Sequence, residues 1–221
     1  VDIRLDCTVV DSRQGAAETE LLLSNGSGCV ADVIVAGIGG IPNDELARAA
    51  GIACGNGSEV DAESRTPAER VWAVGDVAAR HHPAWGRRVR LESWDNAEQH
   101  GARAGRSIAA SWDGVSAHDL TDEPPPWFWT DQYDLNLQIL GNVTESDCTV
   151  VRAGRDGATS MVFHFRGGAL SGAELVCAGR ERPLVKKLLQ AGWPLAPEKL
   201  GDSGTSLKEL LAMTQTAGAH S

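Results

Sequence analysis

An aspartate at the end of an apolar run, followed by a helix-like segment, is the feature of this chain best placed to do chemistry. Asp76 follows Gly75 at the end of the short apolar run 71–74, and Trp94 stands directly ahead of a helix-like segment. A carboxylate at the tip of a strand can accept hydrogen bonds from ligand hydroxyl groups, and glycine lets the backbone approach a ligand closely. The N-terminus of a helix adds a partial positive charge. Together these features predict a place where a polar ligand is held.

Two kinds of element must position these residues. The apolar, β-branched run 71–74 suits a buried strand that ends at Gly75. Ser93 or Asp95 can cap a helix that continues to about residue 110. A second nearly continuous apolar run, 31–38, predicts another strand, buried on both faces of a parallel sheet.

The remaining pattern divides into a sheet-forming start and an α+β end. The alternation predicts early strands at 1–5, 7–10 and 19–23, with a hairpin turn at Asn25-Gly26. A short helix is expected at 45–50 and a short strand near 59–61. After three consecutive prolines, 124–126, we expect antiparallel strands at 135–140, 149–153, 160–165 and 169–176, and helices at 183–191 and 206–213.

Several motifs together resemble one enzyme family. They are V-W-A-V-G-D at 71–76, E-S-W-D-N-A at 92–97, P-W-F-W-T-D-Q-Y at 126–133, G-I-G-G-I-P-N at 37–43 and L-G-D-S-G-T-S-L-K-E-L at 200–210. The chain is similar, from about residue 31 to its C-terminus, to the C-terminal half of the FAD-dependent ferredoxin reductases that serve oxygenases.

The resemblance implies an α/β fold. A partial three-layer FAD/NAD(P)-binding domain would be followed by a smaller α+β C-terminal domain with an antiparallel sheet. Residues 1–30 would then be the tail of the NAD(P)-binding domain, and 31–112 the second segment of the FAD-binding domain. A linker at 113–126 would lead to the C-terminal domain at 127–221.

The same resemblance implies a cofactor, substrates and site residues. FAD would take hydride from NADH or NADPH and pass electrons to a 2Fe–2S ferredoxin that feeds an oxygenase or cytochrome P450. Asp76 would bond the ribityl chain and Trp94 would lie beside the flavin. The cofactor-binding residues expected in this way are Gly75, Asp76, Glu92, Trp94, Trp129, Gly37 and Gly39.

The aromatic run 127–129 allows two interpretations. Strand alternation places Trp127 and Trp129 on one face and Phe128 on the other. Three aromatics at the start of a strand commonly anchor a core. In the resembled family this segment leads over the flavin pocket, and of the two tryptophans we favour Trp129 as the one that lines it.

The chain departs from the complete family in its nucleotide loops. The glycine fingerprint G-x-G-x-x-G is absent, and at 37–42 a proline stands where the third glycine would be. Such loops hold the pyrophosphates of FAD and NAD. We therefore expect these 221 residues alone to bind neither cofactor tightly.

Charge and composition narrow the range of partners. A formal net charge of −10 disfavours nucleic acid and anionic membrane surfaces. No apolar run approaches the ~20 residues that span a bilayer, so we expect a cytoplasmic protein. The five scattered cysteines form no C-x-x-C pair, and the histidines show no metal-ligand spacing. Neither a disulfide framework nor a metal site is expected.

One local run of basic residues stands out against the acidic whole. Between residues 77 and 91 there is no acid, and the arginines there are Arg80, Arg87, Arg88 and Arg90. The run is either a solvated loop or a docking patch for the acidic ferredoxin, whose encounter it would steer. Both interpretations remain open.

Two other functions remain alternatives. The chain could be a catalytically inactive interaction module that forms a homodimer through its C-terminal sheet, which the missing nucleotide loops favour. It could also resemble the apoptosis-inducing-factor group of flavoproteins, which carries a related aromatic segment. The absence of targeting patterns makes this second alternative the weaker one.

Overall fold

The computed structural model describes residues 1–113, 124–154, 157, 159–192 and 195–218. They form two compact units, Val1–Ile41 and Pro42–Ser221, each described here by itself. Part of the predicted linker, residues 114–123, lies outside the described residues. Among the residues described, no helix is both long and apolar enough to cross a membrane.

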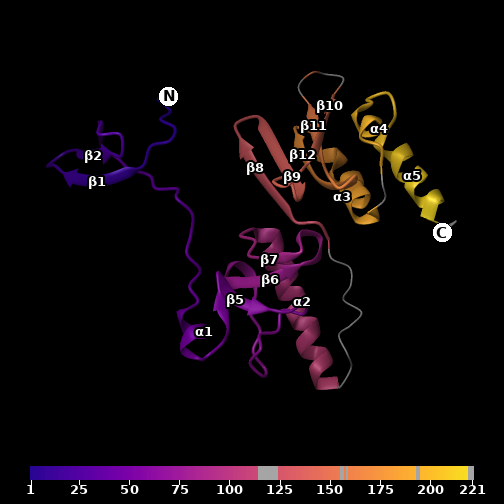
Figure 1. Ribbon diagram of the computed structural model, residues 1–221, viewed down its shortest axis with the longest axis horizontal. Coiled ribbons are helices and arrows are strands. Elements are labelled where there is room, and N and C mark those ends of the chain that lie inside the picture. Colours follow the sequence, from indigo (N-terminus) through magenta and orange to yellow (C-terminus); the bar gives the residue numbers. More distant parts are fainter. Residues whose placement is uncertain (114–123, 155–156, 158, 193–194, 219–221) are drawn as a thin grey trace. The chain divides into compact units, whose positions relative to one another are not determined.

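The first unit is a three-stranded antiparallel sheet followed by an irregular stretch (Figure 1). Its strands are β1 (Val9–Gln14), β2 (Thr19–Leu23) and β3 (Gly28–Ala31), in the order β1-β2-β3. The β2–β3 hairpin turns at Gly26, whose φ of +81° is easy for glycine alone. The prediction of β2 and of this turn is confirmed, whereas a strand at 1–5 is wrong.

The predicted buried strand at 31–38 is also wrong. The chain from residue 33 to residue 41 has no regular structure, and Val35 and Ile38 are 90% and 94% exposed. A strand exists only where neighbouring strands accept its backbone hydrogen bonds. None of the described strands pairs with this run, so its apolar composition alone does not make it a strand.

The second unit begins with a short helix and a mixed four-stranded sheet. Helix α1 (Glu45–Ala49) precedes β4 (Cys54–Gly55), β5 (Gly57–Val60), β6 (Ala78–His82) and β7 (Arg87–Val89), which lie in the order β4-β5-β6-β7. Strands β5 and β6 are parallel, and the other neighbours are antiparallel. The expected basic loop is therefore a hairpin, closed by the 3-10 turn η2 (Pro83–Trp85) and Gly86.

The run 71–74 is not the buried strand that its composition suggested. Val71 and Val74 are 37% and 39% exposed, and the run's one ladder contact is an isolated bridge between Arg65 and Trp72. Thr66 closes this turn by donating its backbone N–H to the carbonyl oxygen of Val71. In the described part of the chain, the run 71–74, like the run 31–38, has no strands on both sides that would bury it. Beyond it come the 3-10 turn η1 (Gly75–Val77) and the long helix α2 (Trp94–Asp113).

A five-stranded antiparallel sheet forms the rest of the second unit. Its strands are β8 (Trp127–Gln132), β9 (Leu135–Gly141), β10 (Cys148–Ala153), β11 (Ser160–Arg166) and β12 (Ala169–Val176), in the order β10-β11-β12-β9-β8. The four strands predicted here are confirmed within one residue at each end. The helices are the 3-10 helix η4 (Gly179–Glu181) and α3 (Arg182–Ala191), α4 (Pro197–Gly201) and α5 (Leu207–Gly218), of which η4 and α4 were not predicted.

The core lies between this sheet and its helices. Phe163 and Phe165 of β11, Leu175 of β12 and Leu188 of α3 are at most 1% exposed. Helices α3 and α4 contact the sheet, and both contact α5 (Figure 1). At roughly 25 cal/mol for each Å² of apolar surface removed from water, this burial is the main force that folds the domain.

A buried arginine fastens α4 and the following turn to the sheet. Arg152 of β10 is 8% exposed, and it donates hydrogen bonds to the carbonyl oxygens of Leu200 at 3.2 Å, Asp202 at 2.7 Å and Thr205 at 2.7 Å. These carbonyls belong to the end of α4 and the turn before α5. The Arg152 side chain therefore supplies the hydrogen-bond donors that backbone N–H groups would otherwise have to supply.

Replacing this arginine should destabilise the C-terminal domain. We expect Arg152→Met to lower the free energy of unfolding by about 2–4 kcal/mol, because methionine fills similar space but leaves the three carbonyls without their charged donor. Urea denaturation followed by circular dichroism measures the change. Arg180→Met, at an exposed position, is the control. An equal loss in both variants would contradict the role given to Arg152.

Candidate functional site

The Gly75–Val77 turn packs on the first turn of α2. Gly75 is buried with φ +68°, and a Cβ added to it would lie 3.5 Å from the Cβ of Ala97. That distance is ordinary van der Waals contact, so it is the positive φ that favours glycine here. The turn therefore presents Asp76, which is exposed, beside the N-terminal end of α2.

Arg90 fixes the backbone of this turn from the other side. Its Nη1 donates to the carbonyl oxygen of Asp76 at 3.0 Å, and its Nε donates to Asn56 Oδ1 at 3.3 Å. The same guanidinium pairs with the carboxylate of Glu92. Glu92, predicted as a site residue, thus acts on the turn through Arg90, while the Asp76 carboxylate itself stays exposed to solvent.

The start of α2 is capped by Ser93, one of the two predicted candidates. Its Oγ accepts the backbone N–H of Asn96 at 3.3 Å, and Asn96 Nδ2 in turn donates to the carbonyl oxygen of Leu91 at 2.8 Å. Asp95 lies inside the first turn, where burial raises the pKa of its carboxyl group despite the opposing charges of Lys186 and Arg182. Gln99 donates to Asp95 at 2.5 Å.

Three tryptophans join α2 to the C-terminal sheet. Trp94 and Trp129 meet edge to face, with ring centroids 6.2 Å apart and planes at 83°. Trp129 stacks on Trp127 at 4.6 Å, as the alternation predicted for residues on one face of β8. The guanidinium of Arg182 lies 4.0 Å from the Trp127 ring centroid, a cation–π contact at the far end of the row. Trp94 remains 62% exposed and so offers much of its surface to a ligand.

The two predicted glycines of the 37–43 loop lie in the first unit. Gly37 and Gly39 belong to the irregular stretch before Pro42, where Gly39 has φ +87°. Their part in binding a nicotinamide nucleotide stays a prediction. Arg182 was missed at the sequence level, because no pattern distinguishes an arginine that precedes a helix proline from any surface cation.

The predicted basic patch is mostly committed to the protein itself. Arg80 is 7% exposed and cannot contact a partner, which corrects its assignment to a docking surface. Arg88 donates to the carbonyl oxygens of Val60 at 3.0 Å and Ala79 at 2.9 Å, and Arg90 serves the Asp76 turn. Arg87, Arg88 and Arg90 each form an ion pair, and the side chain of Arg87 is the most exposed of the three, at 57%.

A buried basic cluster lies between β6 and α2. Arg80 and His82 on β6, with His100 and Arg103 on α2, are each at most 7% exposed. Burial, reinforced by both arginines, lowers the pKa of His82 and of His100 to about 4. His81 adds a small further effect on His82. Both buried histidines are therefore neutral at pH 7.

Comparisons with known proteins agree with this fold. Residues 1–101 match the family described as pyridine nucleotide-disulphide oxidoreductase, and residues 127–211 match the family described as reductase C-terminal. The ferredoxin–NAD(+) reductase component of the anthranilate 1,2-dioxygenase system of Burkholderia cepacia is 40% identical over 182 residues, which are 82% of this chain and 43% of that protein. Putidaredoxin reductase of Pseudomonas putida is 34% identical over 215 residues, 96% of this chain and 49% of that protein.

Solved structures give the same result. A covalent putidaredoxin reductase–putidaredoxin complex matches with a TM-score of 0.83 and 33% identity, over 97% of this chain and 50% of that one. A ferredoxin reductase from Rhodopseudomonas palustris matches with a TM-score of 0.81 and 30% identity, over 93% and 49%. The chain spans about half the length of the relatives it matches.

The fold and the matches define the class of protein: part of the pyridine nucleotide-disulphide oxidoreductase fold, followed by an α+β domain of the reductase C-terminal type. The chain is similar to ferredoxin reductases over 82% to 96% of its own length, which is less than half of theirs. The predicted family and fold class are thereby confirmed.

The two buried histidines should make this part of the protein sensitive to acid. In the unfolded chain they protonate near pH 6.5, but in the folded chain only near pH 4, so stability is full above about pH 6.5 and falls as the pH drops toward 4. We expect a loss of roughly 2 kcal/mol per histidine between pH 7.5 and pH 5.

Chemical denaturation at the two pH values measures this loss. The double variant His82→Asn/His100→Asn should lose most of the pH dependence, and His81→Asn, at an exposed position, should keep it. A double variant with an unchanged slope would show that other groups cause the acid sensitivity.

Proposed function

We propose that this chain is the C-terminal half of an FAD-dependent NAD(P)H:ferredoxin reductase that supplies electrons to an oxygenase. The single observation that carries the proposal is the meeting of three features at one place. An exposed indole, Trp94, opens a 20-residue helix, the Gly75–Val77 turn packs on that helix start, and Trp129 of the reductase domain contacts the indole. Relatives 34–40% identical are named as reductases of this kind.

The residues present fit a flavin. Asp76 offers an exposed carboxylate to the hydroxyl groups of a ribityl chain, and the exposed face of Trp94 offers a flat surface to an aromatic ring. Bound FAD would supply hydride acceptance and single-electron release. The chain's own share is to orient the ring, and the positive end of α2 favours negative charge that develops on it.

In this proposal Glu92 is a positioning residue, because it acts on the Asp76 turn through Arg90. Trp129 holds the indole of Trp94 edge-on and carries the reductase domain to the site. Gly37 and Gly39 would approach NADH or NADPH. The electron acceptor would be a 2Fe–2S ferredoxin, the protein would be cytoplasmic, and it could form a homodimer.

The chain alone should fail to retain the cofactor. After incubation with FAD and desalting, we expect no flavin absorbance to remain with these 221 residues, because no G-x-G-x-x-G loop is present to hold the pyrophosphate. The visible absorbance spectrum of the desalted protein shows whether flavin is retained. A retained band that NADH bleaches would contradict the requirement for those loops.

A fusion to the N-terminal half of putidaredoxin reductase should restore binding and test Asp76. We expect the fusion to hold FAD and to be reduced by NADH under argon, and Asp76→Ala to weaken FAD binding roughly tenfold or more, since bonds to a charged acceptor are strong. Flavin fluorescence during titration measures the affinity. Glu69→Ala, an exposed acid elsewhere, is the control. A fusion that binds FAD equally well with Asp76→Ala would remove Asp76 from the site.

A further inference from the structure

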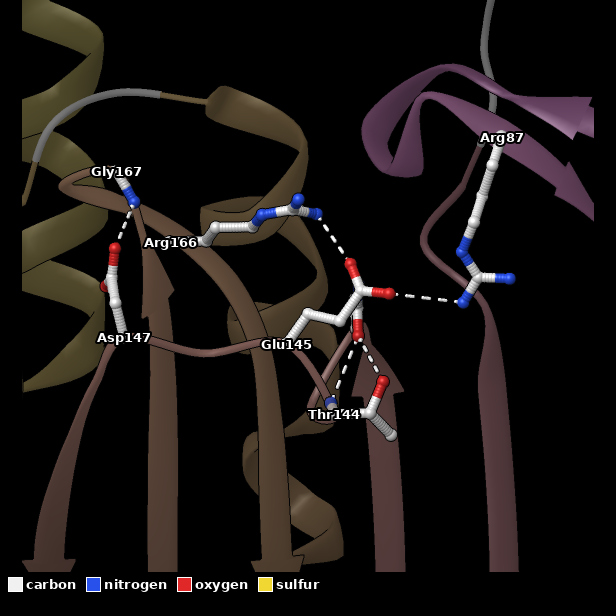
Figure 2. Close-up of polar contacts among 7 residues, drawn as sticks. Arg87, Thr144, Glu145, Asp147, Arg166 and Gly167 are labelled. Atoms are coloured by element: carbon white, nitrogen blue, oxygen red, sulfur yellow. Dashed lines mark hydrogen bonds and ion pairs between the residues drawn. The ribbon is translucent and has the colours of Figure 1, made fainter.

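One carboxylate holds two arginines that come from different parts of the second unit. Glu145, in the β9–β10 loop, accepts Arg87 Nη2 of β7 at 3.2 Å on Oε1 and Arg166 Nη1 of β11 at 2.7 Å on Oε2 (Figure 2). The three side chains are 35%, 57% and 49% exposed in that order. Each carboxylate oxygen therefore serves one guanidinium, and the cluster carries a net positive charge.

The loop that carries Glu145 is held firmly on both sides. Asn142 Oδ1 accepts the backbone N–H and the hydroxyl of Thr144, each at 3.0 Å. Asp147 Oδ2 accepts the backbone N–H of Gly167 at 2.8 Å (Figure 2). Ser146 Oγ lies 3.2 Å from His164 Nδ1. Because its neighbours on both sides are fixed, Glu145 presents its carboxylate at a defined place.

Arg87 also contacts an aromatic ring. Its guanidinium lies 5.8 Å from the ring centroid of Trp85, which itself stacks on the buried His82 at 4.8 Å. Arg87 and Arg166 thus place two partly exposed guanidinium groups on either oxygen of one carboxylate. We call this pair of cations the fork. Such a fork matches a carboxylate on a partner protein.

The fork lies at the end of the sheet where the tryptophan row begins. Gly141, the last residue of β9, donates its N–H to the carbonyl oxygen of Pro126 at 2.8 Å. Trp127, which follows Pro126 and begins β8, pairs with Leu140 of β9. The loop with Glu145 continues from there. A partner acid that binds the fork would therefore dock at the same end of the five-stranded sheet as Trp127.

We propose that Arg87 and Arg166 form the carboxylate-binding site for an acidic ferredoxin, and that Glu145 occupies this site in the free protein as an internal competitor. This inference rests on the proposed reductase function. Exposed ion pairs are individually weak, so the cost of displacing Glu145 is small and the competition is reversible. The competitor favours partners that present several acids over those that present a single one.

Removing the competitor should strengthen binding of acidic probes to the chain. At about 20 mM salt we expect Glu145→Gln to bind poly-L-glutamate and an acidic 2Fe–2S ferredoxin roughly three- to tenfold more tightly than the unmodified protein. Adding Arg166→Gln or Arg87→Gln to that variant should abolish the gain. The gain should shrink at about 300 mM salt, where the Debye length is shorter. Isothermal titration calorimetry measures each affinity.

Glu69→Gln is the matched control, because it removes the same charge from an exposed ion pair, with Arg70, away from the fork. Circular dichroism and thermal melting confirm that each variant is folded. If Glu145→Gln binds poly-L-glutamate no better than Glu69→Gln does, the inference is overturned and Glu145 is only a strut between β7 and β11. If poly-L-glutamate shows the gain and the ferredoxin binds no variant, the fork stands and the proposed ferredoxin partner fails.

Discussion

The candidate site depends on one close contact, the packing of the Gly75–Val77 turn against the first turn of α2. Because Gly75 is buried next to Ala97 with a positive φ, the backbone before Asp76 has one practicable course. Asp76 and Trp94, far apart in sequence, then belong to the same small surface. Arg90 strengthens this arrangement by bonding the carbonyl oxygen of Asp76, so the turn is held from two sides while its carboxylate stays exposed.

The C-terminal domain contributes a second constraint through strand register. Trp127 and Trp129 share a face of β8 because side chains alternate along a strand. Their stacked rings reach α2 through the edge of Trp129 against Trp94. The sheet that carries this row packs on the large core behind β11 and β12, and the row contacts the N-terminal end of α2. The same sheet that buries the hydrophobic core thereby orients the exposed indole of Trp94.

How well sequence predicts structure here depends on where each strand finds its partners. Strands β9 to β12 were predicted within one residue because their antiparallel neighbours are joined to them by short local turns or lie within the same domain. The runs 31–38 and 71–74 look more strand-like by composition, yet neither is a strand in the described structure. A buried strand requires flanking strands, and local composition carries no record of them. Strands β6 and β7 were missed for the opposite reason, since the arginines concealed a hairpin whose buried residues are Ala78, Ala79, Arg80 and His82.

The distribution of positive charge on the surface is the property that the sequence predicts least well. A run of four arginines without an acid predicts a positive patch, but three of the four are engaged in the protein: Arg80 by burial, Arg88 with Val60 and Ala79, and Arg90 with the Asp76 turn. The cation that completes the exposed pair, Arg166, comes from a strand almost eighty residues later. Surface electrostatics is a property of which guanidinium groups the fold leaves uncommitted, and only the tertiary structure decides that. For Arg87 and Arg166 the fold brings two cations together and sets one carboxylate, Glu145, between them. In the proposed docking, an acidic partner would therefore compete with this one side chain.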